Sequence, residues 1–251
     1  MVKVMGYRFW FVFLLVLAIS ISGCIGEKAT QTPTTTQVQG RTLYKLLENE
    51  SQYAVTWVLR LENESSLVSI STGKAVILKD KVLSYREAKG FKDVRWSSSS
   101  IILWENGTGK MIMKMTVGNV TRPYKDIKKF NYTVAKRIAI PYGEIALTLS
   151  DEFKFNETKV SEECNDKCTM YIKKSDGEDV FGVYPNTWRI EVVEANVTYD
   201  PVTKKIIDAS IYMRTSEKFE EKVEMAFHWD KGTIESIRRE LEEIYKEYTT
   251  Q

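Results

Sequence analysis

The sequence has little of the chemistry that enzymes commonly use. It contains one histidine, His228, and it has no Gly-rich phosphate loop, no nucleophile elbow and no histidine pair. His228 falls on the polar face of a predicted strand, which is typical of a solvated surface residue. We therefore expect a protein that is not an enzyme, with no catalytic residue, metal or cofactor. A glycosidase stays open, because its two carboxylates need no local motif.

The sequence also lacks basic runs and an excess of positive charge. Its 36 basic residues include Lys3 and Arg8, which lie in a segment that we expect to be removed, so 34 basic residues would remain against 34 acidic ones. A net charge near zero without a basic patch argues against nucleic acid as a partner.

Cysteine is scarce, and the first of the three cysteines has an informative position. Cys24 follows Ile21-Ser22-Gly23, a basic start and the charge-free apolar run Phe9–Ile21. Basic, apolar and small residues in this order are typical of a secretory signal. The segment resembles the lipobox of prokaryotic lipoproteins, with Ile21 in the place of the usual leucine. The resemblance implies a signal peptide over residues 1–23 and a lipid on Cys24.

An uncleaved anchor helix is the alternative at this end of the chain. The charge-free stretch Phe9–Gly26 has 18 residues, which is the lower edge of what can span a bilayer. With either N-terminus, we expect the globular part at the extracellular face of the cell membrane.

The other two cysteines, Cys164 and Cys168, are four positions apart. Outside the cell, such a pair is typical of a disulfide that closes a small turn. A zinc site would need more ligands, and a redox-active pair would need a thioredoxin-like context that the sequence lacks.

Asparagine is concentrated in glycosylation sequons. Seven of the nine asparagines are followed by X-Ser or X-Thr, which predicts N-glycans on an exposed surface. Together with a prokaryotic lipobox, they indicate an archaeal cell-surface glycoprotein. The seven are Asn49, Asn63, Asn106, Asn119, Asn131, Asn156 and Asn196.

The chain is expected to hold one domain behind a linker. Residues 27–40 are rich in Thr and Gln and have almost no large apolar side chain, which is typical of a solvated linker. We therefore predict a lipid anchor and linker over 24–40 and a single β-rich domain over 41–251. A short helix is expected over Arg41–Gln52.

From Tyr53 onward the apolar period changes from helical to two, which predicts strands. An Asn106-Gly107 hairpin joins two of them. Less regular segments are predicted as a loop over Pro123–Phe130 and as long connections around 118–135 and 151–167. The predicted strands of this part are Tyr53–Leu61, Val68–Leu78, Lys81–Ala88, Ile101–Glu105, Lys110–Val117, Tyr132–Ile140, Glu144–Ser150, Cys168–Lys173 and Val180–Tyr184.

The last third of the chain has the clearest pattern. Arg189–Tyr199, Lys204–Arg214 and Phe219–Asp230 alternate apolar and polar residues, which predicts an antiparallel meander with one apolar face. Thr233–Tyr248 then has an apolar stripe at helical spacing, so we expect an amphipathic helix that covers the sheet.

These elements resemble the LolA/LppX-like lipoprotein-carrier and sorting group. The likeness rests on the element order and on two segments, residues 103–107 (LWENG) and 197–207 (VTYDPVTKKII). It implies an antiparallel curved sheet or half-barrel wrapped around helices, with acyl chains held on the concave side. The predicted fold class is therefore mainly β, with a short N-terminal and a longer C-terminal helix.

The first functional hypothesis is a surface lipoprotein that binds or carries a lipid or another apolar ligand. The apolar strand faces are rich in Trp, Met and Phe. Met111, Met113 and Met115 share one face, which fits a flexible wall against lipid, a Cu(I) site or ordinary core. The predicted ligand-lining residues are Trp57, Leu59, Met113, Ile211, Met225, Phe227 and Trp229.

Two other functions fit the same features. The stalk, the predicted glycans and the lack of a catalytic site also suit a structural or adhesive surface module. The anchor would equally suit an accessory subunit that a membrane transporter or a membrane enzyme holds as its partner.

Overall fold

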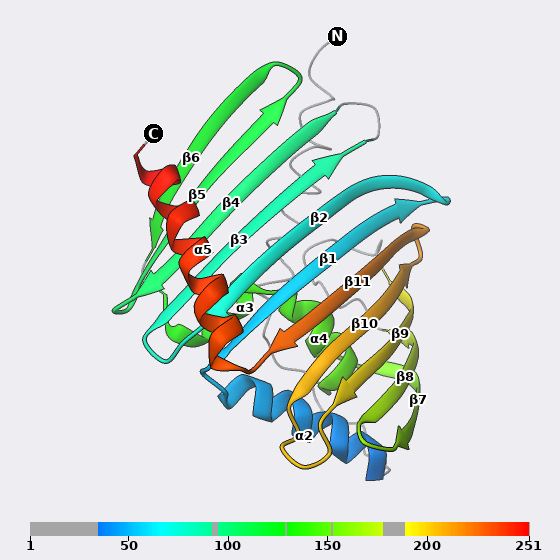
Figure 1. Ribbon diagram of the computed structural model, residues 1–251. Coiled ribbons are helices and arrows are strands. Elements are labelled where there is room, and N and C mark those ends of the chain that lie inside the picture. Colours follow the sequence, from blue (N-terminus) through cyan, green and yellow to red (C-terminus); the bar gives the residue numbers. More distant parts are fainter. Residues whose placement is uncertain (1–34, 92–94, 129, 152, 178–188, 251) are drawn as a thin grey trace.

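A computed structural model describes residues 35–91, 95–128, 130–151, 153–177 and 189–250. Eleven antiparallel strands form one open sheet, flanked by helices on both faces (Figure 1). This confirms the predicted fold class. The strands are β1 (Tyr53–Asn63), β2 (Ser66–Ile77), β3 (Lys81–Gly90), β4 (Trp96–Glu105), β5 (Thr108–Val117), β6 (Val120–Lys128), β7 (Phe155–Cys164), β8 (Cys168–Gly177), β9 (Ile190–Tyr199), β10 (Ile206–Thr215) and β11 (Phe219–His228).

The strand order places the first and the last strand side by side in the middle of the sheet. The order is β6-β5-β4-β3-β2-β1-β11-β10-β9-β8-β7, so β6 and β7 form the two edges. Between these edges the chain passes through two short helices, α3 (Tyr132–Ala139) and α4 (Tyr142–Leu149). The β1–β11 register pairs Val55 with Phe227 and Trp57 with Met225, which brings apolar side chains from both ends of the chain onto one face.

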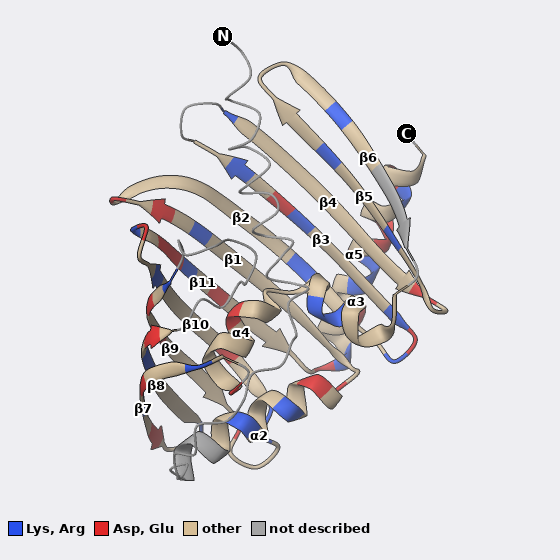
Figure 2. Cartoon of the chain, turned by 180° about the vertical axis from the view of Figure 1, so that it is seen from behind, with Lys and Arg blue, Asp and Glu red and all other residues tan. Residues whose placement is uncertain are grey.

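We call the face that carries α3, α4 and the N-terminal helix α2 (Thr35–Asn49) the inner face. Figure 2 looks onto this face and shows the three helices across one end of the strands, with the other ends of β2 to β6 extending beyond them. A large apolar cluster, the inner cluster, lies between these helices and the sheet.

The opposite, outer face carries the C-terminal helix α5 (Lys231–Thr249), which packs on β1, β2 and β3. Asp230 caps its first turn and accepts a hydrogen bond from the Thr233 backbone N–H at 2.7 Å. The predicted apolar stripe is confirmed, because all six of its residues join a second apolar cluster, the outer cluster. They are Ile234, Ile237, Leu241, Ile244, Tyr245 and Tyr248.

The structure corrects the middle of the predicted sheet. Tyr132–Ile140 and Glu144–Ser150 were expected as strands but form α3 and α4. The Asn131 side chain caps α3 by accepting from the Val134 N–H at 2.9 Å. In α4 every residue is buried, so the sequence carries no polar stripe that would indicate a helix.

Both edge strands were also missed. The predicted loop at Pro123 lies in β6, where an edge position tolerates a residue without an N–H. The predicted connection 151–167 contains β7, which is mostly exposed and therefore shows no apolar alternation.

The N-terminal helix begins earlier than expected. It starts at Thr35 instead of Arg41 and ends at Asn49 instead of Gln52. Part of the predicted linker is therefore helical, and Gly40 is buried beside Met170 and Leu149. The predicted strand Val180–Tyr184 lies outside the described residues, as do the signal segment and Cys24. No helix in the described part of the chain is long and apolar enough to cross a membrane.

Candidate functional site

The inner face brings together most of the residues predicted to line a ligand site. Five of them are buried in the inner cluster, and Trp229 packs against it. Trp229 also donates from Nε1 to the Ile206 carbonyl oxygen at 2.6 Å. The five buried residues are Trp57, Leu59, Ile211, Met225 and Phe227.

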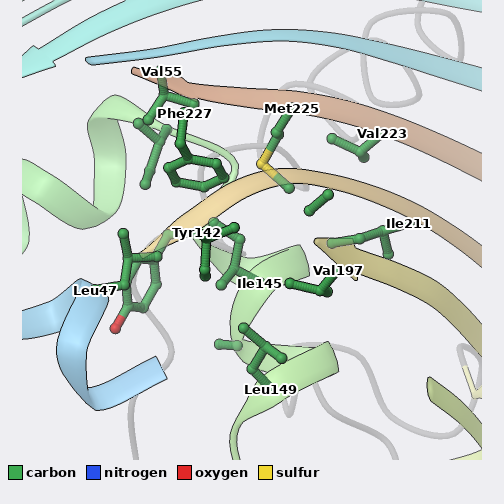
Figure 3. Packing of buried hydrophobic residues seen from close by; sticks show 14 of the residues in the cluster. Leu47, Val55, Tyr142, Ile145, Leu149, Val197, Ile211, Val223, Met225 and Phe227 are labelled. Atoms are coloured by element: carbon green, nitrogen blue, oxygen red, sulfur yellow. The ribbon is translucent and has the colours of Figure 1, made fainter. Parts of the chain in front are cut away.

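Helix α4 fills the space above this part of the sheet. In Figure 3, Ile145 and Leu149 of α4 lie among Val197, Ile211 and Phe227 of the strands. The space that these side chains enclose has a cavity volume of about 0 Å³. An apolar ligand could therefore occupy this end of the inner face only in place of α4.

The inner face has a floor of small residues, which begins within the inner cluster at Trp57 and against which two indole rings lie. A Cβ added to Gly73 would be 2.1 Å from the Trp57 ring, and one added to Gly90 would be 1.9 Å from Trp96 Nε1. Only glycine permits these positions of the two rings. We call these residues the floor: Ser69, Ser71, Gly73, Ala88, Gly90, Ser98 and Ser100, with Trp57 and Trp96.

A methionine ridge borders this floor on β5. Met113 pairs with Ser100 and Met115 with Ser98. The intervening Ile112 belongs to the outer cluster, so the methionines point to the inner face. Met111, Met113 and Met115 are half-buried, and none of them belongs to either apolar cluster of the described residues. This placement does not support the interpretation as ordinary core.

Two buried carboxyl groups and a half-buried arginine form an ionisable cluster between α4 and the sheet. Glu144 of α4 and Glu221 of β11 are 6% and 8% exposed, and their carboxyl groups share a hydrogen bond. Arg86 of β3 donates from Nε to Ser71 Oγ at 2.7 Å. We call Arg86, Glu144 and Glu221 the buried ionisable cluster.

Burial raises the pKa of both carboxyl groups in this cluster. The pKa of Glu221 is raised well above its ordinary value, by burial first and then by the charge of Glu144. For Glu144, its own backbone N–H, the hydrogen bond with Glu221 and the charge of Arg86 oppose the rise in pKa. Burial therefore favours the neutral form of both carboxyl groups, and most strongly that of Glu221.

Two buried lysines hold the inner helices at their C-terminal ends. Lys136 Nζ donates to the carbonyl oxygens of Leu47, Glu48 and Glu50 at 3.1, 2.6 and 2.6 Å. Lys174 Nζ donates to those of Leu147 and Ser150 at 2.7 and 3.0 Å. Burial lowers the pKa of each lysine to about 8. A cation satisfies carbonyl groups that a helix end otherwise leaves unpaired.

The disulfide joins an exposed cysteine, Cys164, to a buried one, Cys168, and most of the sequon asparagines lie at the surface. Cys164 and Cys168 form a disulfide between β7 and β8, and the nearby Glu162 carboxylate therefore has no thiolate with which to share a metal. Six of the seven sequon asparagines are exposed, and Asn63 is half-buried. Glycan occupancy and the lipid on Cys24 stay predictions.

The outer face has an open groove of about 400 Å³ over β1, β10 and β11. Thr56, Ser210 and Glu224 line it, and His228 beside it contacts Thr56 Oγ1 at 3.3 Å. Val58 and Ala226 also line the groove, and Ser210 and Glu224 lie on the predicted polar face of the C-terminal meander.

Sequence reasoning did not identify the buried ionisable cluster or the two lysines. A signal for Glu221 was present, because it lies two residues before Val223 and so shares the apolar face of its strand. Glu144 gave no such signal, since the segment was predicted as a strand. The lysines bond to helix ends that are distant in sequence, which no local pattern reveals.

Some solved structures resemble this chain, but with low sequence identity and low TM-scores. LprF from Mycobacterium bovis has 10% sequence identity and a TM-score of 0.44, over 78% of this chain and 93% of that one. A DUF1329 family protein from Desulfovibrio piger has 12% identity and a TM-score of 0.22, over 79% and 95%. Neisserial surface protein A has 9% identity and a TM-score of 0.22, over 71% and 95%.

The match to LprF extends over most of the chain. No protein-family model matches the chain. No curated protein matches it either. Because all three TM-scores are below 0.5, the proposals below rest on the geometry of the chain itself.

Proposed function

We propose that this protein is a lipid-anchored cell-surface lipoprotein that binds or carries a lipid or another apolar ligand on the inner face of its sheet. The observation that carries the proposal is the floor with its two flat indole rings and the adjoining methionine ridge. Trp96 and the three methionines are half-buried and lie outside the two apolar clusters of the described residues, and apolar surface of this kind can mark a binding surface. Methionine adapts to irregular apolar partners, which suits a mobile acyl chain.

The inner face is also long enough for an acyl chain. A strand of ten residues, such as β4 or β5, spans roughly 33 Å, which accommodates an extended acyl chain along the strands. The buried side chains of α4 already occupy one end of this face, so a long ligand would either displace α4 or lie on the floor beyond it.

Fluorescence quenching by a brominated lipid tests the binding surface. The full chain, held in amphipol to avoid detergent, is titrated with methyl 9,10-dibromostearate, because bromine quenches tryptophan only on contact. We expect saturable quenching that is reduced in Trp96→Phe, since Trp96 is half-buried on the floor. Trp104→Phe is the matched control, because Trp104 is buried in the inner cluster and donates to the Phe130 carbonyl oxygen at 2.8 Å. Quenching that is equal in both variants would contradict the proposal.

The anchor is part of the proposal and has its own test. We propose that Cys24 carries the lipid, and that the seven sequons carry glycans outside the cell. Cys24→Ser in the native host is expected to abolish labelling with a fatty-acid analogue. A Cys24→Ser variant that still incorporates the analogue would contradict the lipidation.

One observation favours a second function, a structural or adhesive module. The space beneath α4 is filled, as it would be in a domain that binds nothing there. This candidate predicts no saturable quenching of any tryptophan in the same titration.

A further inference from the structure

The sequon asparagine Asn196 lies in the middle of a strand. On β9 it pairs with Tyr171 of β8 on one side and with Ser210 of β10 on the other. Its neighbours Ala195 and Val197 belong to the inner cluster, so the exposed Asn196 side chain points to the outer face. The other six sequon asparagines end α2 or β1, lie in the turns before β5 and β6, cap α3 or lie near the start of the edge strand β7. A glycan on Asn196 would therefore leave the face of the sheet.

The groove of the outer face begins one strand away from Asn196. Ser210 lines this groove, which has a volume of about 400 Å³ and reaches across β11 to β1. From β9 to β1 the sheet has three strand spacings, or about 14 Å. Sites for small ligands have volumes of about 300 to 1,000 Å³, so the groove is large enough to hold sugar units.

The path from Asn196 to the groove is open. Helix α5 packs on β1, β2 and β3. Figure 1 looks onto the outer face and shows no described helix across β9, β10 or β11. An antiparallel sheet tolerates one solvated face, and here that face carries a sequon beside a groove. A chain of sugars attached to Asn196 can therefore cross β10 and enter the groove.

The strand register places the polar groups of the groove within reach of this chain of sugars. One row across the sheet runs from Asn196 through Ser210 and Glu224 to Val58. Glu224 is two strand spacings, or about 10 Å, from Asn196. Asp208 lies on the adjacent strand β10 and lines the same groove.

The lining of the groove matches a neutral sugar. Thr56 and Ser210 have hydroxyl groups that both donate and accept, and Asp208 and Glu224 have carboxylates that accept from sugar hydroxyl groups. Hydrogen bonds to an ionised acceptor are stronger than those between neutral groups. The same two carboxylates disfavour an acidic sugar, because like charges placed side by side repel each other. The groove therefore favours sugar units without a carboxylate or a sulfate.

We propose that the groove of the outer face binds the glycan that Asn196 carries, through neutral sugar units whose hydroxyl groups donate to Asp208 and Glu224. The glycan covers the outer face of β10 and β11, as α5 covers that of β1 to β3. This inference rests on the proposed glycan at Asn196 and does not depend on the ligand proposed for the inner face.

Carboxyl-group footprinting of the glycosylated chain from its own host tests the inference. Carboxylates are coupled to glycine ethyl ester with a water-soluble carbodiimide, and the labelled peptides are quantified by mass spectrometry. Asp208 and Glu224 are exposed in the polypeptide alone, so their protection reports a bound glycan. In Asn196→Gln we expect both to be labelled about threefold faster or more, because a sugar held by one net hydrogen bond covers them for most of the time.

Controls separate the loss of the glycan from a change in the strand. Thr198→Val removes the sequon but keeps Asn196, and it should raise the labelling of Glu224 as Asn196→Gln does. Asn106→Gln removes the sequon of the β4–β5 turn and should leave the labelling of Glu224 unchanged. Glu243, which is exposed on α5, should be labelled equally in every variant.

Three results would overturn the inference. Equal labelling of Asp208 and Glu224 with and without the Asn196 glycan would do so and leave the glycan itself established. Acidic first sugar units on Asn196 would contradict the neutral sugar that the groove favours. Glycopeptides without any sugar on Asn196 would also contradict the proposed glycosylation at this position. The quenching by brominated lipid tests the inner face separately, so its outcome stays distinguishable from all three.

Discussion

At the scale of single residues, four ionisable side chains of the described part of the chain lie in its interior beside polar partners. Lys136 and Lys174 bond to carbonyl groups at helix ends, and Glu144 and Glu221 share a hydrogen bond. Each of these groups would be costly to bury alone. They hold the inner helices at fixed positions on the sheet.

Neighbouring lysines on β8 give a matched pair of substitutions. Lys174→Met should lower the free energy of unfolding by about 2 kcal/mol, because it leaves the buried Leu147 and Ser150 carbonyl oxygens without their donor. Lys173→Met removes only an exposed ion pair with Glu194, worth less than about 1 kcal/mol. Urea unfolding measures both. Equal losses would contradict the capping role of Lys174.

The glutamate pair predicts a fall in stability as the pH rises. Its folded pKa values are raised, so its contribution is complete below the unfolded pKa and is lost as the pH rises through the folded values. Between about pH 5 and 7.5, the titration of the glutamate pair is separated from that of the other groups with shifted pKa values. The lowered lysine pKa values of about 8 act above this window, and carboxylates with lowered pKa values, such as Glu235, act below it.

Melting temperatures across this window test the pair. We expect the melting temperature of the unaltered chain to fall from pH 5 to 7.5, and that of Glu221→Gln to vary less. A Glu221→Gln variant with the same slope would show that other groups cause the dependence.

At the scale of elements, a helix or strand could be predicted well when one of its faces is buried and the other is exposed to solvent. Helix α5 and strands β9 to β11 each have an apolar and a polar side, and their periods were read correctly. Helix α4 is buried all round, and β7 is exposed nearly all round, so neither carries a usable period. The candidate site was predicted least well, because one of its two glutamates, Glu144, lies on α4.

The outer helix offers a stability test of the correctly predicted stripe. Leu241 is fully buried in the outer cluster, so Leu241→Ala should cost about 3 kcal/mol through lost burial and the cavity left behind. Glu243→Ala, at an exposed position of the same helix, should change stability by less than about 0.5 kcal/mol. Chemical denaturation of both variants provides the comparison.

The floor can be tested through one glycine. In Gly90→Ala the new methyl group would overlap the Trp96 indole, so the ring must leave the sheet. We expect a red-shifted tryptophan emission and weaker quenching by the brominated ester. Gly232→Ala, whose Cβ would lie 3.5 Å from the Asp230 carboxylate, should change neither. Unchanged emission in Gly90→Ala would contradict the position of Trp96.

At the scale of the whole molecule, the topology explains where sequence reasoning stopped. Hairpins and the C-terminal meander follow from local patterns, but the pairing of β1 with β11 joins segments from opposite ends of the chain. No local period reveals that pairing, nor the passage of α3 and α4 from one sheet edge to the other. The inner face exists only because of these two long-range features.

The central claim is that this inner face holds an apolar ligand. Native mass spectrometry of the protein, released gently from the membrane of its own host, tests this claim most directly. We predict a mass above that of the covalently modified chain, lost on denaturation as a discrete molecule with an acyl tail. A mass that is identical before and after denaturation, in protein shown to be folded, would contradict the account.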